Sequence, residues 1–112
     1  MNPGSPEPIY AQIASAIRRE VAAGRVRPGE RLPGARELAA SLGVNLHTVL
    51  RSYQELRDEG VVELRRGRGA VVTHAAPRIA GPAAALRAFV AEARRAGLTA
   101  AEAAAMVRAE MS

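Results

Sequence analysis

The chain lacks cysteine, tryptophan and lysine, and these absences exclude several kinds of site. Without cysteine it forms no disulfide and offers no thiolate to a metal. Its three aromatic residues are too few to stack successive bases of a single strand. No apolar run approaches the roughly 20 residues of a membrane span, and the N-terminus carries no secretion signal. We therefore expect a cytoplasmic protein that does not enter a membrane.

Groupings of catalytic or metal-binding residues are also missing. Asp58 is the only aspartate, and His47 and His74 stand without the carboxylate pattern of a metal site. The run Gly67-Arg68-Gly69 is too short for a nucleotide-binding loop and does not precede a helix. We expect no catalytic site, no metal and no cofactor.

What the chain has in excess is arginine. All 16 basic residues are arginine, against 11 acidic residues, and the formal net charge is +5. This excess favours a polyanionic partner, because positive potential steers association with phosphates and arginine binds phosphate or guanine through two parallel hydrogen bonds. A GC-rich genome would also explain arginine in place of lysine, together with 25 alanines. It would not explain where the arginines lie.

The first part of the chain predicts a loose arm and a helix. Residues 1–7 are rich in proline, glycine and serine, and we expect a flexible arm. The helix should run from Pro8 to Gly24, with Arg18 and Arg19 on its outer surface. Its apolar residues recur every four positions: Ile9, Ile13, Ile17 and Val21.

Two further helices follow with almost no linker between them. The first is short, Ala35 to Leu42, with Leu38 and Leu42 expected to be buried, and Gly43 lies just beyond its end. Asn45 is a good N-cap for the second helix, which should end near residue 59. Its core positions are Val49, Tyr53 and Leu56. A short helix, a glycine turn and a second helix predict a helix-turn-helix.

A hairpin should complete this domain. Residues 61–64 and 70–73 favour strands, and the tip between them holds two glycines and three arginines. The hairpin is the wing of a winged helix-turn-helix domain over residues 8–74. The expected fold class is mainly α with a small β-hairpin wing, followed by two short helices.

The tail predicts a linker and a dimerisation segment. Residues 75–82 change in composition and are expected to be a linker. A helix over 83–96 should follow, and Thr99 with Glu102 forms a capping-box pattern for another. One apolar stripe runs along this segment, 83–112: Leu86, Phe89, Val90, Ala93, Val107 and Met111. Two short helices cannot cover the stripe, so burial against a second copy is expected. The alternative is folding back on the winged domain.

Several short motifs, in one order, resemble the DNA-binding domain of GntR-type regulators over Pro8 to Val72. They are P-I-Y-x-Q-I, G-x-x-x-P-G-x-x-L-P, R-E-L-A, L-G-V, T-V, L-x-x-E-G and G-x-G. The short tail is similar to that of the YtrA subgroup, which has a small helical dimerisation segment. The family often has a phosphate-binding serine after the proline of L-P. Here the residue is Gly34, whose backbone amide could serve a phosphate.

The resemblance implies that Arg36 of the second helix contacts DNA. In helix-turn-helix proteins the first residues of the recognition helix, here the third helix, reach the major groove, and the arginine-rich hairpin tip fits the minor groove or the backbone. The candidate DNA-contacting residues therefore lie on the second and third helices and the wing. These are Arg36, Asn45, Leu46, His47, Thr48, Arg51, Arg65, Arg66, Gly67 and Arg68. Simpler roles remain open for several. Arg36 has Glu30 or Glu37 as possible ion-pair partners, and Arg51 has Glu55 four residues on. For Asn45 the alternative is a cap with no DNA contact, and for Leu46 it is packing against the wing instead of a thymine methyl group.

The implied function is a dimeric repressor that binds a palindromic operator in double-stranded DNA. In the YtrA subgroup the regulated operon is often the regulator's own or encodes a transporter. A small-molecule effector is possible and unidentified. The alternative is a winged-helix module that binds proteins without sequence-specific DNA binding. Some GntR relatives carry a pyridoxal-phosphate domain, but this chain is too short to hold one.

Overall fold

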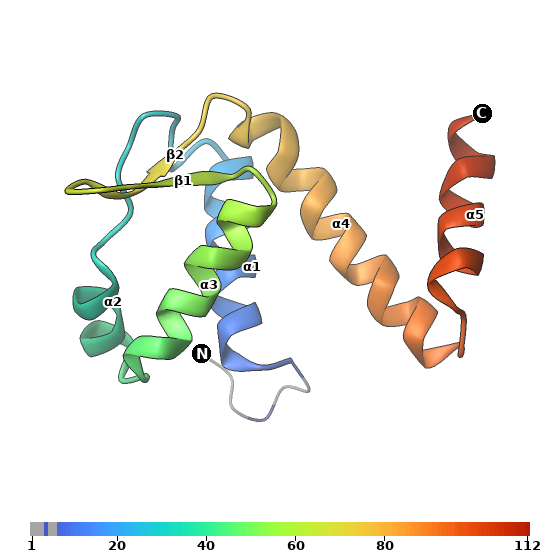
Figure 1. Cartoon of the computed structure of the whole chain (residues 1–112), viewed down its shortest axis with the longest axis horizontal. Coiled ribbons are helices and arrows are strands. Elements are labelled where there is room, and N and C mark those ends of the chain that lie inside the picture. The colour runs from blue at the N-terminus through green and yellow to red at the C-terminus, as the bar shows by residue number, and fades with distance from the viewer. Residues whose placement is uncertain (1–3, 5–6) are drawn as a thin grey trace.

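The structure is a computed structural model that describes residue 4 and residues 7–112. The flexible arm predicted for residues 1–7 therefore lies mostly outside the described residues. The elements are α1 (Ile9–Ala22), α2 (Ala35–Leu42), α3 (Leu46–Asp58), β1 (Val62–Arg65), β2 (Gly69–Val72), α4 (Ala76–Arg95) and α5 (Ala100–Met111). The predicted fold class, mainly helical with a two-stranded antiparallel hairpin, is confirmed (Figure 1). Within the described part of the chain, no helix is both long and apolar enough to cross a membrane.

Helices α1 and α3 pack against each other and both contribute to the core, which the hairpin and the start of α4 complete. From α1, Ile13 and Val21 are buried, as the four-residue repeat predicts. From α3 come the three predicted core residues Val49, Tyr53 and Leu56. Figure 1 shows the two helices side by side beneath the hairpin. This pairing fixes the axis of α3 relative to the rest of the domain.

The turn between α2 and α3 forms as its residues predict. Gly43 has a φ of 68°, a left-handed conformation that glycine adopts without the steric cost of a Cβ. Asn45 caps α3, and its side chain accepts a hydrogen bond of 2.8 Å from the His47 amide. Leu42, expected to be buried, is 37% exposed. It is the last residue of α2, and Ala39, one turn earlier, is the residue of this helix that is buried.

The hairpin pairs with an unexpected third segment. Its own register runs from Val62 opposite Val72 to Arg65 opposite Gly69. Outside the hairpin, the Leu32 amide donates to the Ala70 carbonyl at 2.8 Å, and the Val72 amide donates to that of Glu30, also at 2.8 Å. The stretch between α1 and α2 thus returns along β2 and ties the wing to the start of α2.

The linker predicted for residues 75–82 is wrong, because helix α4 begins at Ala76. Ala76 and Ala80 are fully buried, and Ile79 packs against the same core. Alanines four residues apart give the helix a narrow face that lies close against α1. Pro77 fits because the first helical positions need no amide donor.

Helices α4 and α5 form an arm that projects from the domain (Figure 1). Gly97, with a φ of 77°, ends α4. Thr99 and Glu102 form the predicted capping box, with bonds of 3.1 Å and 2.8 Å between each side chain and the other residue's amide. None of the α5 residues, all of which are described, is buried. Helix α5 stands away from the winged domain in Figure 1, so this helix does not fold back onto that domain.

Candidate nucleic-acid interface

The beginning of α3 presents a row of polar side chains to solvent. Asn45, His47 and Arg51 are exposed, while Leu46 and Thr48 are half-buried. His47, Thr48 and Arg51 line one shallow hollow together with Tyr10 of α1. The structure therefore brings the predicted α3 residues to one end of the helix, beside the start of α1.

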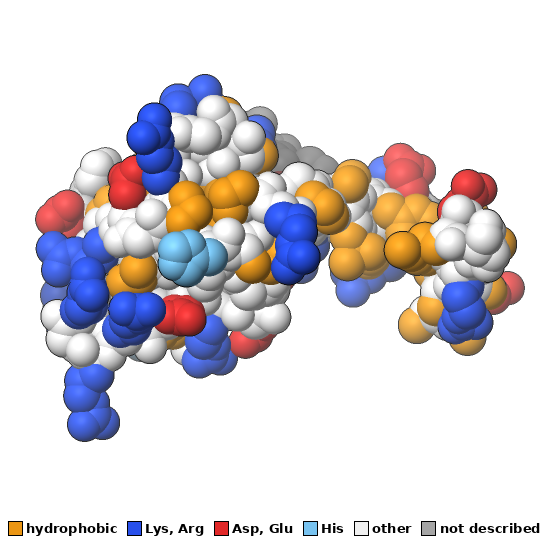
Figure 2. All heavy atoms as spheres, turned by 90° about the horizontal axis from the view of Figure 1, so that it is seen from above, with side chains coloured by type: hydrophobic (Ala, Val, Ile, Leu, Met, Phe, Trp, Pro, Cys, Tyr) orange, Lys and Arg blue, Asp and Glu red, His pale blue; other side chains and the backbone are white. Residues whose placement is uncertain are grey.

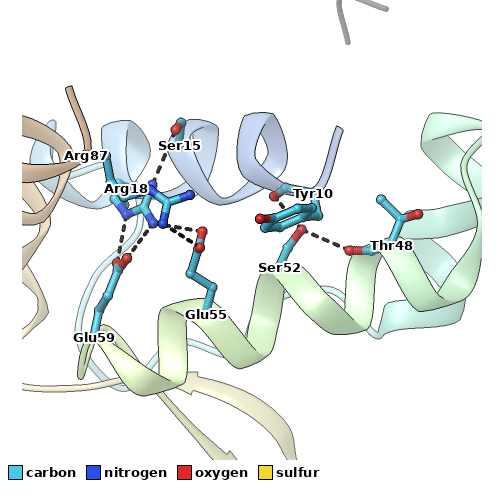
Figure 3. Close-up of polar contacts among 8 residues, drawn as sticks. All are labelled: Tyr10, Ser15, Arg18, Thr48, Ser52, Glu55, Glu59 and Arg87. Atoms are coloured by element: carbon cyan, nitrogen blue, oxygen red, sulfur yellow. Dashed lines mark hydrogen bonds and ion pairs between the residues drawn. The ribbon is translucent and has the colours of Figure 1, made fainter. Parts of the chain in front are cut away.

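Buried hydrogen bonds hold α3 in place behind this row. The Ser52 hydroxyl is fully buried and lies 2.7 Å from the Tyr10 carbonyl oxygen and 3.1 Å from that of Thr48 (Figure 3). The Tyr53 hydroxyl donates to the Pro33 carbonyl at 2.7 Å, at the entry to α2. The role of Ser52 was not predicted from the sequence. A serine among the core positions of a helix indicates a hydroxyl that bonds to a nearby backbone carbonyl.

Arg51 does not form the ion pair with Glu55 that its spacing allows. Its guanidinium instead lies over the ring of Tyr10, 3.8 Å from the centroid. Glu55 pairs with Arg18 of α1 at 3.1 Å and with Arg87 of α4 at 2.7 Å. An aromatic face attracts a cation without neutralising its charge, so Arg51 stays available to an anion.

Arg18, expected on the outer surface of α1, is fully buried. Its guanidinium hydrogen-bonds Glu59 at 2.8 Å and 2.6 Å, and it also bonds Glu55 and Ser15 (Figure 3). Burial would lower the pKa of Arg18, but the hydrogen bonds and negative charges of Glu59 and Glu55 outweigh it and raise that pKa. Arginine is buried here because two carboxylates meet it, Glu55 on α3 and Glu59 just after the end of that helix.

Arg36 lies in the first turn of α2 and is exposed. Neither acidic neighbour binds it, since no carboxylate in the described part of the chain pairs with Arg36. Glu30 instead accepts a hydrogen bond from the Arg27 amide at 3.0 Å. Gly34, just before α2, has open space where a Cβ would stand. A larger residue would therefore fit at that position.

The wing arginines are not equivalent. Arg65 is held by Glu63 on the same strand, with its Nη2 2.8 Å from a carboxylate oxygen. Arg66 and Arg68 are exposed, and neither has an ion-pair partner among residues 7–112. Gly67 between them has a φ of 80°, which lets the tip turn tightly. Figure 2 shows basic side chains gathered at the end of the molecule where the hairpin tip lies.

A hollow of about 450 Å³ separates the wing from α3 and the start of α2. Leu50 of α3 and Leu64 of β1 are 39% and 43% exposed and both line it. Gly34 and Arg68 line it as well, so the start of α2 and the wing tip open onto the same space. Local sequence patterns do not predict this apolar surface, because it is shaped where residues 30–32 pair with β2, far along the chain.

The arm carries a second hollow, of about 600 Å³, between α4 and α5. The six apolar residues predicted for dimerisation all line it: Leu86, Phe89, Val90, Ala93, Val107 and Met111. Leu86 is 53% exposed and Met111 84% exposed. Figure 2 shows this apolar surface along the arm. The structure gathers the predicted residues on one surface, and what covers them stays a prediction.

Comparisons with known proteins agree on one family. The family model described as "Bacterial regulatory proteins, gntR family" matches residues 9–72. The HTH-type transcriptional regulator Rv1152 of Mycobacterium tuberculosis is 40% identical over 93 residues, 83% of this chain and 77% of that protein. The repressor YtrA of Bacillus subtilis is 40% identical over 73 residues. That match spans 65% of this chain but only 56% of YtrA.

Solved structures extend the likeness to the arm. A YtrA protein from Sulfolobus acidocaldarius, a GntR-family transcription factor, has a TM-score of 0.63 and 32% identity, and the match covers 99% of this chain and 94% of that one. A GntR-family regulator from Listeria monocytogenes has a TM-score of 0.68, with 28% identity and 96% and 97% coverage. The AraR DNA-binding domain in complex with operator ORX1 matches 65% of this chain and 90% of that one, at 28% identity and a TM-score of 0.60.

Proposed function

Because the chain belongs to the GntR family and is a DNA-binding transcription regulator of the YtrA-like kind, we propose that it is a homodimeric repressor that reads a palindromic operator. It acts on chromosomal DNA in the cytoplasm, at its own operon or a transporter operon. The proposed role is regulatory and includes no catalytic step.

The proposed DNA-reading face is supported by where three segments and their exposed arginines lie. The start of α2, the start of α3 and the wing tip lie on one side of the molecule (Figure 1), and Arg36, Arg66 and Arg68 there have no carboxylate partner among the described residues. In this proposal α3 enters the major groove with His47 and Thr48 near base edges. The wing arginines hold the flanking backbone or minor groove.

Fluorescence anisotropy tests sequence-specific binding. The probe is a labelled duplex from upstream of the protein's own gene, with a shuffled duplex as control, at low and moderate salt. We expect the native duplex to bind at least ~10³-fold more tightly at moderate salt. Arg36→Ala should weaken binding by about 1–3 kcal/mol, while Arg95→Ala, an exposed arginine paired with Glu92 on the arm, should not. Equal binding of both duplexes that disappears with salt would support the protein-interaction module instead.

The apolar groove of the arm supports the homodimer. An exposed apolar surface of this extent is costly in water, and a two-fold dimer would cover both copies with the same residues. Phe89→Asp should convert the dimer to a monomer of the 11.8 kDa chain, measured by light scattering after size exclusion. Ala88→Asp is the matched control, since Ala88 is exposed and does not line the groove. A monomeric wild type would refute the homodimer.

A further inference from the structure

Helix α4 has a weak point in its middle, at Gly81 and Pro82. Before it, Ala76 and Ala80 anchor the helix in the core. Pro82 has no amide hydrogen, so it cannot donate to the carbonyl four residues earlier, and its ring crowds the preceding turn. Gly81 has no side chain, and nothing lies within 4 Å of where a Cβ would be. The part of α4 before Gly81 is anchored in the core. It therefore does not by itself fix the direction of the part after Pro82, which carries the apolar groove.

A contact beyond this weak point ties the outer half of α4 to α3. Arg87 lies past Pro82, and its Nη1 is 2.7 Å from Oε1 of Glu55. Glu55 is on α3, one turn after Arg51. Figure 3 shows Arg87 approaching the same carboxylate cluster from α4. The arm thus contacts the helix that carries the proposed DNA-reading residues.

Glu55 is a rigid partner for this contact. Its other oxygen, Oε2, pairs with the buried Arg18 at 3.1 Å, so the two arginines do not compete for one atom. Arg18 also binds Glu59 through two nitrogens, which fixes the guanidinium. The side chain of Glu55 is only 17% exposed, whereas that of Arg87 is 41% exposed. Surface ion pairs contribute little when both partners move, but here one partner is held by a buried network.

We propose that Arg87 is a positioning residue. Its ion pair with Glu55 sets the direction of the outer half of α4 relative to α3, and so selects the spacing between operator half-sites. This inference rests on the proposed dimer. If two copies join through the arm, the separation of their α3 helices depends on the arm's direction. Half-sites face the same side of the duplex only near whole helical turns. A small change in arm direction therefore changes which spacing binds well.

The test compares half-site spacings. An operator is selected from a random duplex pool with wild type, and its central spacer is then shortened or lengthened by one or two base pairs. The measured quantity is the ratio of Kd values between altered and parent spacers. For wild type we expect a ratio of about tenfold or more for the worst spacer, and we expect Arg87→Ala to lower it by about threefold or more. Arg87→Lys, which keeps the cation, should retain most of the ratio.

Arg95→Ala is the matched control, because Arg95 pairs with Glu92 on its own helix. It should leave the ratio unchanged. An Arg87→Ala protein that is dimeric and folded, with the wild-type ratio, would overturn the inference and leave the proposed function intact. A monomeric Arg87→Ala protein would also overturn it, since the ion pair would then hold the dimer together and not set its geometry. A wild type that is monomeric or indifferent to spacing would overturn the dimeric function, and the inference with it.

Discussion

The guanidinium of Arg51, on α3, lies 3.8 Å from the ring centroid of Tyr10, on α1. The ring orients an exposed cation that has not been neutralised by Glu55. Tyr10→Leu should weaken operator binding by about 0.5–1 kcal/mol, because the unheld arginine must be ordered when DNA binds. Tyr10→Phe keeps the aromatic face and should bind like wild type. Anisotropy measures the affinities, and equal affinity for all three proteins would show that the stacking has no role in binding.

The three arginines of the wing should differ in how much each contributes to the salt dependence of DNA binding. Arg66→Ala and Arg68→Ala should each reduce the slope of log K against log salt by about 1 and weaken binding across sequences. Arg65→Ala should have a smaller effect, because Glu63 already offsets its charge. The measurement is affinity over a salt series. Equal slopes for all three variants would contradict the distinction drawn from the ion pair.

Gly34 offers a gain of affinity. The residue has a φ of −58° and open space around its Cβ position, so serine fits there without strain. Gly34→Ser should add a hydroxyl for a DNA phosphate and tighten binding by about 0.5–1.5 kcal/mol, with a stability change of only a few tenths of a kcal/mol. Gly34→Ala is the control without a hydroxyl. Equal affinities for the serine and alanine variants would argue against a phosphate at this position.

Tyr53 predicts a loss of stability in alkali. Burial, and secondly the charge of Glu37, raises the pKa of Tyr53 from 10.0 to about 12. The unfolded phenol therefore ionises at a lower pH than the folded one. The contribution of the neutral Tyr53 to the free energy of unfolding is fully present below about pH 10. It is lost as the pH rises toward 12, by an amount on the order of 2 kcal/mol.

Tyr53→Phe tests this dependence. It removes the hydrogen bond to the Pro33 carbonyl, which should cost about 1 kcal/mol at pH 7. It also removes the titrating group, so its stability should fall less steeply in alkali than that of wild type. Urea unfolding at pH values from 7 to 11.5 measures both effects. Parallel losses in the two proteins would mean that Tyr53 does not cause the alkaline dependence.

Local signals predicted the helix-turn-helix well. Asn45 and Thr99 cap helices because a side-chain oxygen satisfies amides two or three residues away, so nearby sequence suffices. The repeat of Val49, Tyr53 and Leu56 likewise marks the buried face of α3 within one element. The same periodicity predicted that the apolar residues of the arm lie on one surface, and these residues of α4 and α5 line one groove.

Features that depend on distant partners could not be predicted. Arg18 is buried because Glu55 and Glu59 meet it from 37 and 41 residues away. Ala76 and Ala80 are in the core only because α1 offers a close surface to residues that are otherwise typical of a linker or an exposed helix. Arg87 reaches Glu55 across two elements for the same reason. The ion-pair cluster that joins α1, α3 and α4 is therefore a property of the fold.

Hydroxyl-radical footprinting of the operator complex tests the central claim, a dimer that places one recognition helix in each half-site. The predicted result is two equally protected segments related by two-fold symmetry, with centres one helical turn or a multiple of it apart. Phe89→Asp should lose the paired protection at the same protein concentration. A single protected segment, or even protection along the whole duplex, would contradict the account.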